Sequence, residues 1–148
     1  MICLRHFIAE DIPALQKVYP DMTEQEVRDM LQQWHEMKYN GRYFEMFAVL
    51  SGSEVVGEIS LYEHSKSAVS IGPTIYEPYR QKGYGKEAVK LAICRAREKG
   101  FRIIIQQVRT DNAASIALHN SLGFEIDGHG YIYMNRKEQP CYLFLMAI

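Results

Sequence analysis

One ten-residue stretch, YRQKGYGKEA (residues 79–88), combines two glycines with three basic side chains. It follows the apolar run VSIGPTI (69–75) and opens a segment, residues 84–99, whose pattern predicts a helix. The first turn of a helix carries free backbone amides and a partial positive charge, so it attracts anions. The stretch therefore predicts a phosphate-binding loop where a strand is followed by a helix.

Each residue type in this loop suits an anionic ligand. Gly83 and Gly85 have no Cβ, so the backbone can approach a ligand closely. Arg80, Lys82 and Lys86 add positive charge. The alternative is an ordinary glycine turn among solvated charges, and for an isolated G-x-G it is the better interpretation. The junction between strand and helix, together with the clustered cations, favours the anion site.

Two other phosphate-binding patterns fit this loop less well. A Walker A loop requires G-x-x-x-x-G-K-[ST], but Glu87 follows Lys86 and Arg80 stands where the first glycine belongs. The dinucleotide fingerprint G-x-G-x-x-A does fit residues 83–88. However, that fingerprint follows the first strand of its unit in a tight turn, and an acidic residue ends the next strand. Neither feature is found here, so a dinucleotide-binding domain is disfavoured.

A third pattern fits best, and a second motif supports it. The letters RQKGYG resemble the R/Q-x-x-G-x-G/A pyrophosphate loop of the GNAT N-acetyltransferases, which use acetyl-coenzyme A. The segment VRTDNAASIALHNSLGFEIDG (108–128) resembles the fifth strand and fourth helix of the same family, in its phosphinothricin-type and ribosomal-protein-type branches. The resemblance implies one N-acetyltransferase domain over residues 1–148. It would transfer the acetyl group to a primary amine of a small molecule, peptide or protein by direct attack.

The resemblance also implies where acetyl-coenzyme A would bind. Backbone amides of the glycine loop would hold the pyrophosphate, and the pantetheine arm would lie between two separated strands of the sheet. Asn112 would touch the pantetheine or adenosine side, although a plain helix N-cap is an equally good interpretation of this residue. The residues implied to bind the coenzyme are Thr74, Ile75, Arg80, Gln81, Lys82, Gly83, Tyr84, Gly85, Lys86, Asn112 and Ser115.

Pro73 departs from the family pattern. Many relatives polarise the thioester carbonyl with a main-chain N–H near this position, and proline has no N–H. We expect a neighbouring amide or a side chain to supply the donor instead.

Two residues are candidates for proton transfer. His119 stands where many relatives have a tyrosine that serves the leaving thiolate, and histidine can donate a proton. A histidine satisfied at a contact between helix and sheet is the alternative. Glu58 lies within VVGEISL, on one strand face with Ser60 and Tyr62, and is a candidate base for the amine. Its alternative is an outward charge on a half-exposed strand.

The acceptor and the partners are less defined. The segments that line the acceptor pocket in the family carry Trp34, Tyr39, Tyr43, Tyr131 and Tyr133, although core packing is an alternative for most of them. The principal alternative function is a nonenzymatic coenzyme A-binding regulatory module of the same fold. A homodimer is a further expectation, because the final strand, YLFLMAI, could pair at a sheet edge.

Composition excludes several classes of function. With 17 basic and 18 acidic residues, the formal charge of −1 gives no general attraction to nucleic acid or membranes. Cys3, Cys94 and Cys141 are scattered, so we expect buried free thiols in a reducing cytosol. The histidines have no metal-ligand spacing, and no metal is expected. The chain shows no signal core and no apolar run of about 18 residues, so a cytoplasmic location is expected.

The elements that position these residues follow from the hydrophobic pattern. The predicted order is β-α-α-β-β-β-α-β-α-β-β, a mixed α/β sheet of about seven strands with helices on both faces. A capping box, Thr23 with Glu26, starts the second helix. The predicted strands are 2–8, 44–50, 54–62, 68–76, 102–108, 125–134 and 141–147. The predicted helices are 10–19, 24–39, 84–99 and 113–122.

Overall fold

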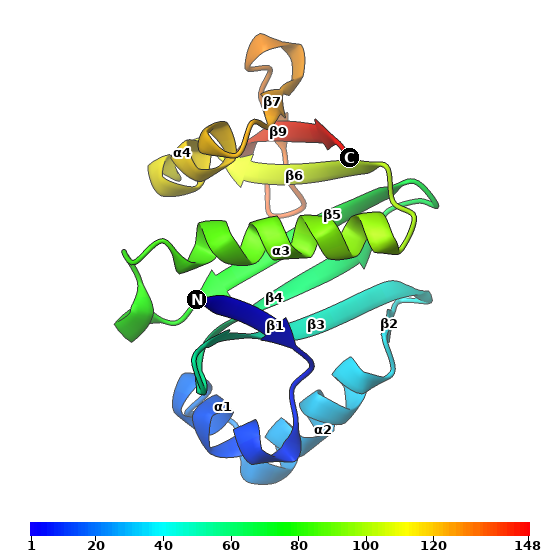
Figure 1. Ribbon diagram of the computed structural model, residues 1–148. Coiled ribbons are helices and arrows are strands. Elements are labelled where there is room, and N and C mark those ends of the chain that lie inside the picture. The colour runs from blue at the N-terminus through cyan, green and yellow to red at the C-terminus, as the bar shows by residue number, and fades with distance from the viewer.

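The computed structural model describes all residues from Met1 to Ile148. Nine strands form one mixed sheet (Figure 1), and seven of them follow the order β1-β3-β4-β5-β6-β9-β7. The short strands β2 and β8 pair with β3 and β9. The strands are β1 (Ile2–Arg5), β2 (Lys38–Tyr39), β3 (Arg42–Ser51), β4 (Glu54–Glu63), β5 (Ala68–Ile75), β6 (Ile103–Arg109), β7 (Glu125–Ile126), β8 (Tyr133–Met134) and β9 (Pro140–Ala147).

Helices cover both faces of this sheet, as predicted. Figure 1 shows α3 crossing the centre of the sheet, α4 beside β6, and α1 with α2 near β3. The helices are α1 (Ile12–Val18), α2 (Glu24–His35), α3 (Tyr84–Glu98) and α4 (Ala113–Ser121). Three 3-10 turns, η1, η2 and η3, cover Ala9–Asp11, Glu77–Tyr79 and Asp127–His129.

Two hydrophobic cores mark the two faces. The larger core packs α3 against the sheet and includes Ile59 and Leu61 of β4, so we call this side the α3 face. The smaller core packs α1 and α2 against Ala48 and Leu50 of β3, so we call the other side the α1–α2 face. Because strand residues alternate between faces, Glu58 lies on the α1–α2 face. The fold therefore separates the side that carries α3 from the side that carries Glu58.

The strands β5 and β6 separate along their length. They run parallel but pair only at Ala68 with Ile103 and at Val69 with Ile104. By contrast, β5 keeps an antiparallel register with β4 as far as Ile75. We call the space between the carboxyl-terminal halves of β5 and β6 the gap. Because the two strands are parallel, α3 and α4 both begin at the open end of the gap.

Several predicted boundaries are wrong for identifiable reasons. The predicted strand 125–134 is broken into β7, a 3-10 turn and β8, since Gly128, His129 and Gly130 have positive φ values of 56°, 56° and 102°. The second helix starts at the predicted capping box but ends at His35, and positive φ at Met37 turns the chain into β2.

The final strand is not at an edge of the sheet. Strand β9 pairs with β6 on one side and with β7 and β8 on the other. The proposed reason for a homodimer is therefore wrong. The expectation of buried thiols is also only partly correct, because Cys141 is buried while Cys3 and Cys94 are exposed.

Candidate active site

The predicted phosphate loop is a row of free backbone amides at the start of α3. Gln81 and Gly83 have left-handed φ values of 64° and 79°, and Gly83 is the N-cap of the helix. The first backbone hydrogen bond after Arg80 is donated by Glu87, to the carbonyl of Gly83. The amides of residues 81–86 therefore have no acceptor within the chain. Such a row of amides at a helix N-terminus is suited to bind an anion.

The basic side chains predicted for this loop lie around it. Arg80 and Lys82 are exposed, and Lys86 is half-buried in the first turn of α3. The Nε of Arg80 donates a hydrogen bond of 2.9 Å to the carbonyl of Ile75, which ties the loop to the end of β5. No atom outside the adjacent residues lies within 4 Å of a Cβ built on Gly83, so the space beside the loop is open. A ligand of the size of a diphosphate has access to these amides.

The other predicted coenzyme contacts lie along the same edge. Thr74 and Ile75 end β5, beside the gap, and Thr74 is exposed. Asn112 and Ser115 open α4, which follows β6. The Oδ1 of Asn112 accepts a hydrogen bond of 3.1 Å from the amide of Ser115, so Asn112 is the N-cap of α4. The tertiary structure thus brings these residues to one end of the gap.

His119 lies inside the protein, between α4 and the sheet. Its side chain is buried, and its ring packs against Phe124 and Phe144. The Nδ1 lies 2.7 Å from the carbonyl oxygen of Ser115, so Nδ1 carries the proton and Nε2 is an acceptor. The Nε2 faces the side-chain amide of Gln106 at 3.4 Å. These contacts support the structural interpretation of His119 over the role of proton donor.

Burial favours the neutral form of the His119 ring. Loss of solvent lowers the pKa of His119, and the hydrogen bond to the Ser115 carbonyl only partly offsets this effect. A neutral ring with its proton on Nδ1 accepts a hydrogen bond from Gln106 without conflict.

Glu58 is a buried carboxylate held by two tyrosines. Only 8% of Glu58 is exposed, so it is not the outward charge considered as its alternative. Tyr19, at the end of α1, donates its hydroxyl hydrogen to Oε1 of Glu58. Tyr76, just after β5, donates to Oε2 at 3.3 Å. Glu58 also pairs across the sheet with Thr74, the next-to-last residue of β5.

The environment of Glu58 favours a weakly acidic carboxyl group. Burial raises the pKa of Glu58, while the hydrogen bonds from Tyr19 and Tyr76 lower it, and burial prevails. Burial and the adjacent carboxylate raise the pKa of both phenols, which therefore remain hydrogen-bond donors. A carboxylate with a raised pKa, next to a cleft, is a candidate general base.

A cavity of about 620 Å³ adjoins this cluster. Thr74, Tyr76 and Arg80 line it, together with residues of α1 and the start of β4. Its wall carries both signs of charge: Lys17 and Arg80 are basic, while Glu54, the first residue of β4, and Glu77, which follows β5, are acidic. The lining residues are Ala14, Lys17, Val18, Glu54, Val55, Thr74, Tyr76, Glu77, Pro78, Tyr79 and Arg80.

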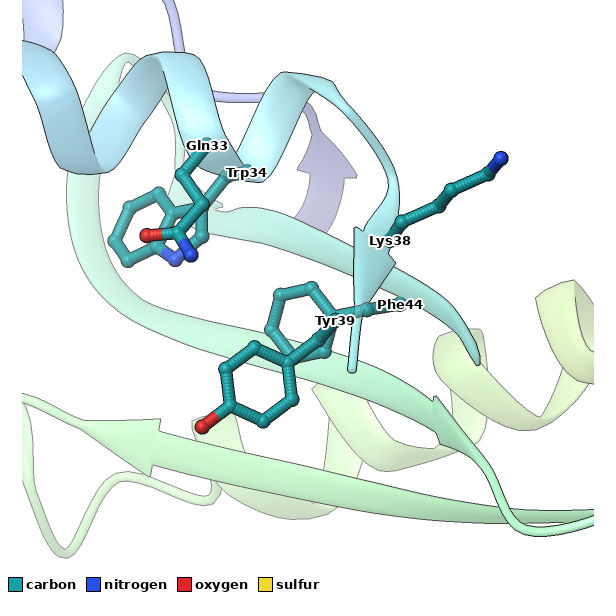
Figure 2. A pocket seen from close by; sticks show the side chains of 5 residues that line it. All are labelled: Gln33, Trp34, Lys38, Tyr39 and Phe44. Atoms are coloured by element: carbon teal, nitrogen blue, oxygen red, sulfur yellow. The ribbon is translucent and has the colours of Figure 1, made fainter. Parts of the chain in front are cut away.

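A second, smaller pocket of about 260 Å³ lies between α2, β2 and β3. Figure 2 shows the rings of Trp34, Tyr39 and Phe44 gathered in it, while Lys38 extends away. The ring centroids of Tyr39 and Phe44 are 6.0 Å apart. Trp34 and Tyr39 therefore line a pocket, as expected of acceptor-side residues.

The other three aromatic residues predicted to line the acceptor pocket, Tyr43, Tyr131 and Tyr133, lie in two different places. Tyr43 packs against Phe101 and donates a hydrogen bond to Glu45, so it belongs to the α3 face and not to an acceptor pocket on the α1–α2 face. Tyr131 and Tyr133 contact each other in the segment between β7 and β9, with ring centroids 4.7 Å apart and ring planes tilted by 59°.

Two residues that the sequence did not indicate complete the site. Tyr19 ends a helix in an ordinary apolar pattern, and nothing nearby in sequence indicates its contact with Glu58, 39 residues away. Gln106 lies in the predicted strand 102–108, directly after the apolar run Ile103–Ile105, and it is buried. A polar residue in a buried strand needs a partner, and that requirement was the available signal for Gln106.

Comparison with known proteins agrees with this architecture. A family description of the acetyltransferase (GNAT) domain matches residues 2–125. The chain belongs to the GNAT acetyltransferase family. Among curated relatives, an L-methionine sulfoximine/L-methionine sulfone acetyltransferase of Pseudomonas aeruginosa is 31% identical over 102 residues. The match covers 66% of this chain and 59% of that protein, so it spans less than two thirds of the relative.

Solved GNAT structures share the fold over nearly the whole chain. RimL, a ribosomal L7/L12 α-N-protein acetyltransferase in complex with coenzyme A, superposes with a TM-score of 0.82 at 18% identity, covering 99% of this chain and 94% of RimL. Spermidine N-acetyltransferase from Vibrio cholerae, in complex with coenzyme A and spermine, has a TM-score of 0.78 at 14% identity, covering 99% and 95%. At these identities the likeness establishes the fold.

Two further observations concern metal ions and membranes. No group of three or more histidine, cysteine, aspartate or glutamate side chains is arranged to hold a metal ion. None of the helices has the length and apolar character needed to cross a bilayer.

Proposed function

We propose that this protein transfers the acetyl group of acetyl-coenzyme A to a primary amine. The observation that carries the proposal is the row of six free amides, residues 81–86, at the start of α3 and beside the gap between β5 and β6. Arg80, Lys82 and Lys86 add positive charge at that position. A pyrophosphate is the ligand that such a row suits best.

The residues present fit the whole coenzyme. The amides of the loop would hold the pyrophosphate, and the unpaired edges of β5 and β6 offer hydrogen bonds to an extended arm with two amides of its own. Asn112 and Ser115 lie at the mouth of the gap on the side of β6. When bound, acetyl-coenzyme A supplies an acyl group activated as a thioester.

Glu58 is the proposed general base. The amine must lose a proton to attack, and Glu58 accepts that proton directly or through one water. The amine nitrogen then bonds to the carbonyl carbon, the carbon–sulfur bond breaks, and the sulfur departs with the electron pair. Glu58 is hydrogen-bonded to Tyr76, which lines the cavity of about 620 Å³, so it lies beside the space from which an acceptor would approach.

The acceptor proposed is a small molecule of the amino acid class. The cavity beside Glu58 carries Lys17 and Arg80 together with Glu54 and Glu77, and these mixed charges suit a zwitterion. The matched relative from Pseudomonas aeruginosa is named for amino acid derivatives, which agrees with this choice. Free thiols at all three cysteines support a reducing, cytoplasmic location for the reaction.

Thiol release tests the proposal. Purified protein with acetyl-coenzyme A is offered amino acids, methionine sulfone, polyamines and N-terminal peptides, and a shift in melting temperature with coenzyme A is recorded in parallel. We expect binding of coenzyme A and turnover with an amino acid derivative. Binding without turnover on any amine would favour the nonenzymatic regulatory module. Absence of binding would contradict the proposed role of residues 81–86.

A further inference from the structure

The side chain of Gln106 closes the inner end of the gap, where the main chain of a neighbouring strand would otherwise bond to β5. The Oε1 of Gln106 accepts a hydrogen bond of 2.7 Å from the amide of Ile71, and its Nε2 donates one of 2.7 Å to the carbonyl of Ile71. These are the two bonds that a neighbouring strand would make with Ile71. Main-chain pairing of β5 with β6 ends two residues earlier, at Val69. Gln106 thus extends the contact between the strands by one step.

We call the two hydrogen bonds between Gln106 and Ile71 the bridge. His119 of α4 contacts the side chain of Gln106 and so supports the bridge. Gln106 is 5% exposed, and its Nε2 faces Nε2 of His119 at 3.4 Å. His119 in turn bonds the carbonyl of Ser115 through Nδ1. A chain of hydrogen bonds therefore runs from α4 through β6 to β5. This chain defines which way the amide of Gln106 faces, since the acceptor Nε2 of His119 requires the NH₂ group on its side.

The bridge leaves few main-chain groups to meet an acyl arm. Successive residues of a strand turn their N–H and C=O to opposite edges, so Ile71, Pro73 and Ile75 all face the gap. The two groups of Ile71 are taken by Gln106, and Pro73 has a carbonyl but no N–H. The carbonyl of Ile75 accepts from Arg80. The edge of β5 that remains open therefore starts at Pro73 and offers the amide of Ile75 as its donor.

We propose that Gln106 is a positioning residue that closes the gap at Ile71 and sets how deeply the acyl end of the coenzyme enters between β5 and β6. The inference rests on the proposed function. Without the side-chain bridge, the open edge would begin two residues earlier, about 6 to 7 Å deeper at the usual rise per residue. The depth at which the thioester lies between β5 and β6 would then no longer be defined.

The first test measures the bridge itself. Hydrogen exchange of the Ile71 amide is followed by NMR in the unliganded protein and in Gln106→Met, which keeps the length of the side chain but cannot bridge. We expect the protection of Ile71 to fall at least tenfold. Gln107→Met is the matched control, because Gln107 is exposed and turned to the other face of β6, and it leaves the protection of Ile71 unchanged. Equal protection in Gln106→Met would overturn the bridge.

A second variant, Gln106→Glu, makes the bridge depend on pH. It also provides an independent test in case Gln106→Met does not fold. In Gln106→Glu, a protonated carboxyl can accept from the amide of Ile71 and donate to its carbonyl, whereas a carboxylate cannot donate. We expect the protection factor of Ile71 to resemble wild type at low pH and to fall as pH rises, while the wild-type factor stays constant. A protection factor of Gln106→Glu that does not change with pH contradicts the proposal.

The third test reads the position of the thioester without turnover. Acetyl-coenzyme A labelled with ¹³C at the carbonyl should give one sharp bound resonance with wild type and a broadened or divided one with Gln106→Met. The Kd for coenzyme A should change less than threefold, because the loop at residues 81–86 holds the pyrophosphate, while kcat falls at least tenfold. An unchanged resonance, or equal losses in Kd and kcat, would overturn the positioning role. If wild type binds no coenzyme A, the proposed function fails, and the role of Gln106 toward the coenzyme fails with it, while the Ile71 measurements still decide the bridge.

Discussion

Tyr19 at the end of α1 donates its phenol hydrogen to Glu58 in the middle of β4, which joins the first helix to the centre of the sheet. The second oxygen of Glu58 receives the phenol of Tyr76. Both hydrogen bonds lower the pKa of Glu58, and burial raises it by more. The acidity of the proposed base is therefore set by a balance that single substitutions can shift.

Removing the first tyrosine should make the base stronger. Tyr19→Phe deletes a hydrogen bond that favours the ionised carboxylate, so the pKa of Glu58 should rise further. A hydrogen bond to a charged group contributes about 1.5 kcal/mol or more, which corresponds to about one pH unit. The rising limb of kcat/KM against pH should move to higher pH by that amount. Tyr43→Phe is the control: it removes a similar bond, to Glu45 on the α3 face, and should leave the pH profile unchanged.

Replacing the base should separate activity from stability. A group whose pKa is raised on folding binds its proton more tightly in the folded state, so stability falls as pH rises from about 4.3 through the folded pKa. Glu58→Gln removes that loss. We expect urea unfolding to show the variant at least as stable as wild type at pH 8, an advantage that shrinks toward pH 4. Activity should fall at least a hundredfold. Full activity in Glu58→Gln would exclude Glu58 as the base.

A second buried carboxylate should matter for stability alone. Glu45 is fully buried, and Arg95 of α3 donates two hydrogen bonds to it at 2.9 and 3.0 Å. Arg95→Met leaves a buried charge short of its main partner and should lower the free energy of unfolding by about 3 kcal/mol at pH 7. The exposed pair of Arg109 with Asp111 is the control, and Arg109→Met should leave the free energy of unfolding nearly unchanged.

The same ion pair predicts a dependence on pH. Although burial raises the pKa of Glu45, the hydrogen bonds from Arg95, Tyr43 and His6 prevail and lower it. A lowered carboxyl pKa contributes stability above about pH 4.3, and this contribution is lost as pH falls through the folded pKa. The difference in unfolding free energy between wild type and Arg95→Met should therefore shrink in acid. A difference that is the same at pH 7 and pH 3 would contradict this account.

The glycine loop can be tested against a glycine elsewhere. Gly83 and Gly100 both have left-handed backbones, with φ of 79° and 89°, and nothing within 4 Å of an added Cβ. Replacing either with alanine should cost about 1 kcal/mol of stability, because an L side chain strains this conformation. Only Gly83→Ala should also weaken coenzyme A binding, by about tenfold, since it displaces the amides of residues 81–86. Equal Kd values for the two variants would argue against the loop as the binding site.

Local signals predicted most of the elements. The capping box at Thr23 starts α2 as predicted, and the turn of residues 51–53 joins β3 and β4. The segment after Glu125 was predicted wrongly, since its apolar residues follow a strand pattern while two glycines turn the backbone away. The alternation of apolar residues favoured a strand there, while the glycines allowed a turn, and the alternation alone could not show which of the two would form.

The sequence by itself determined the glycine loop of residues 80–86 and the helix that follows it. Gly83, Gly85 and the adjacent cations act through backbone conformation and local charge, which neighbours along the chain decide. Only the tertiary structure decided the rest of the site. The contact of Tyr19 with Glu58 spans 39 residues and that of Gln106 with Ile71 spans 35, and both depend on which face each strand presents and where β5 leaves β6. Hydrogen bonds act over about 3 Å, so such partners are defined by packing and not by spacing in the sequence.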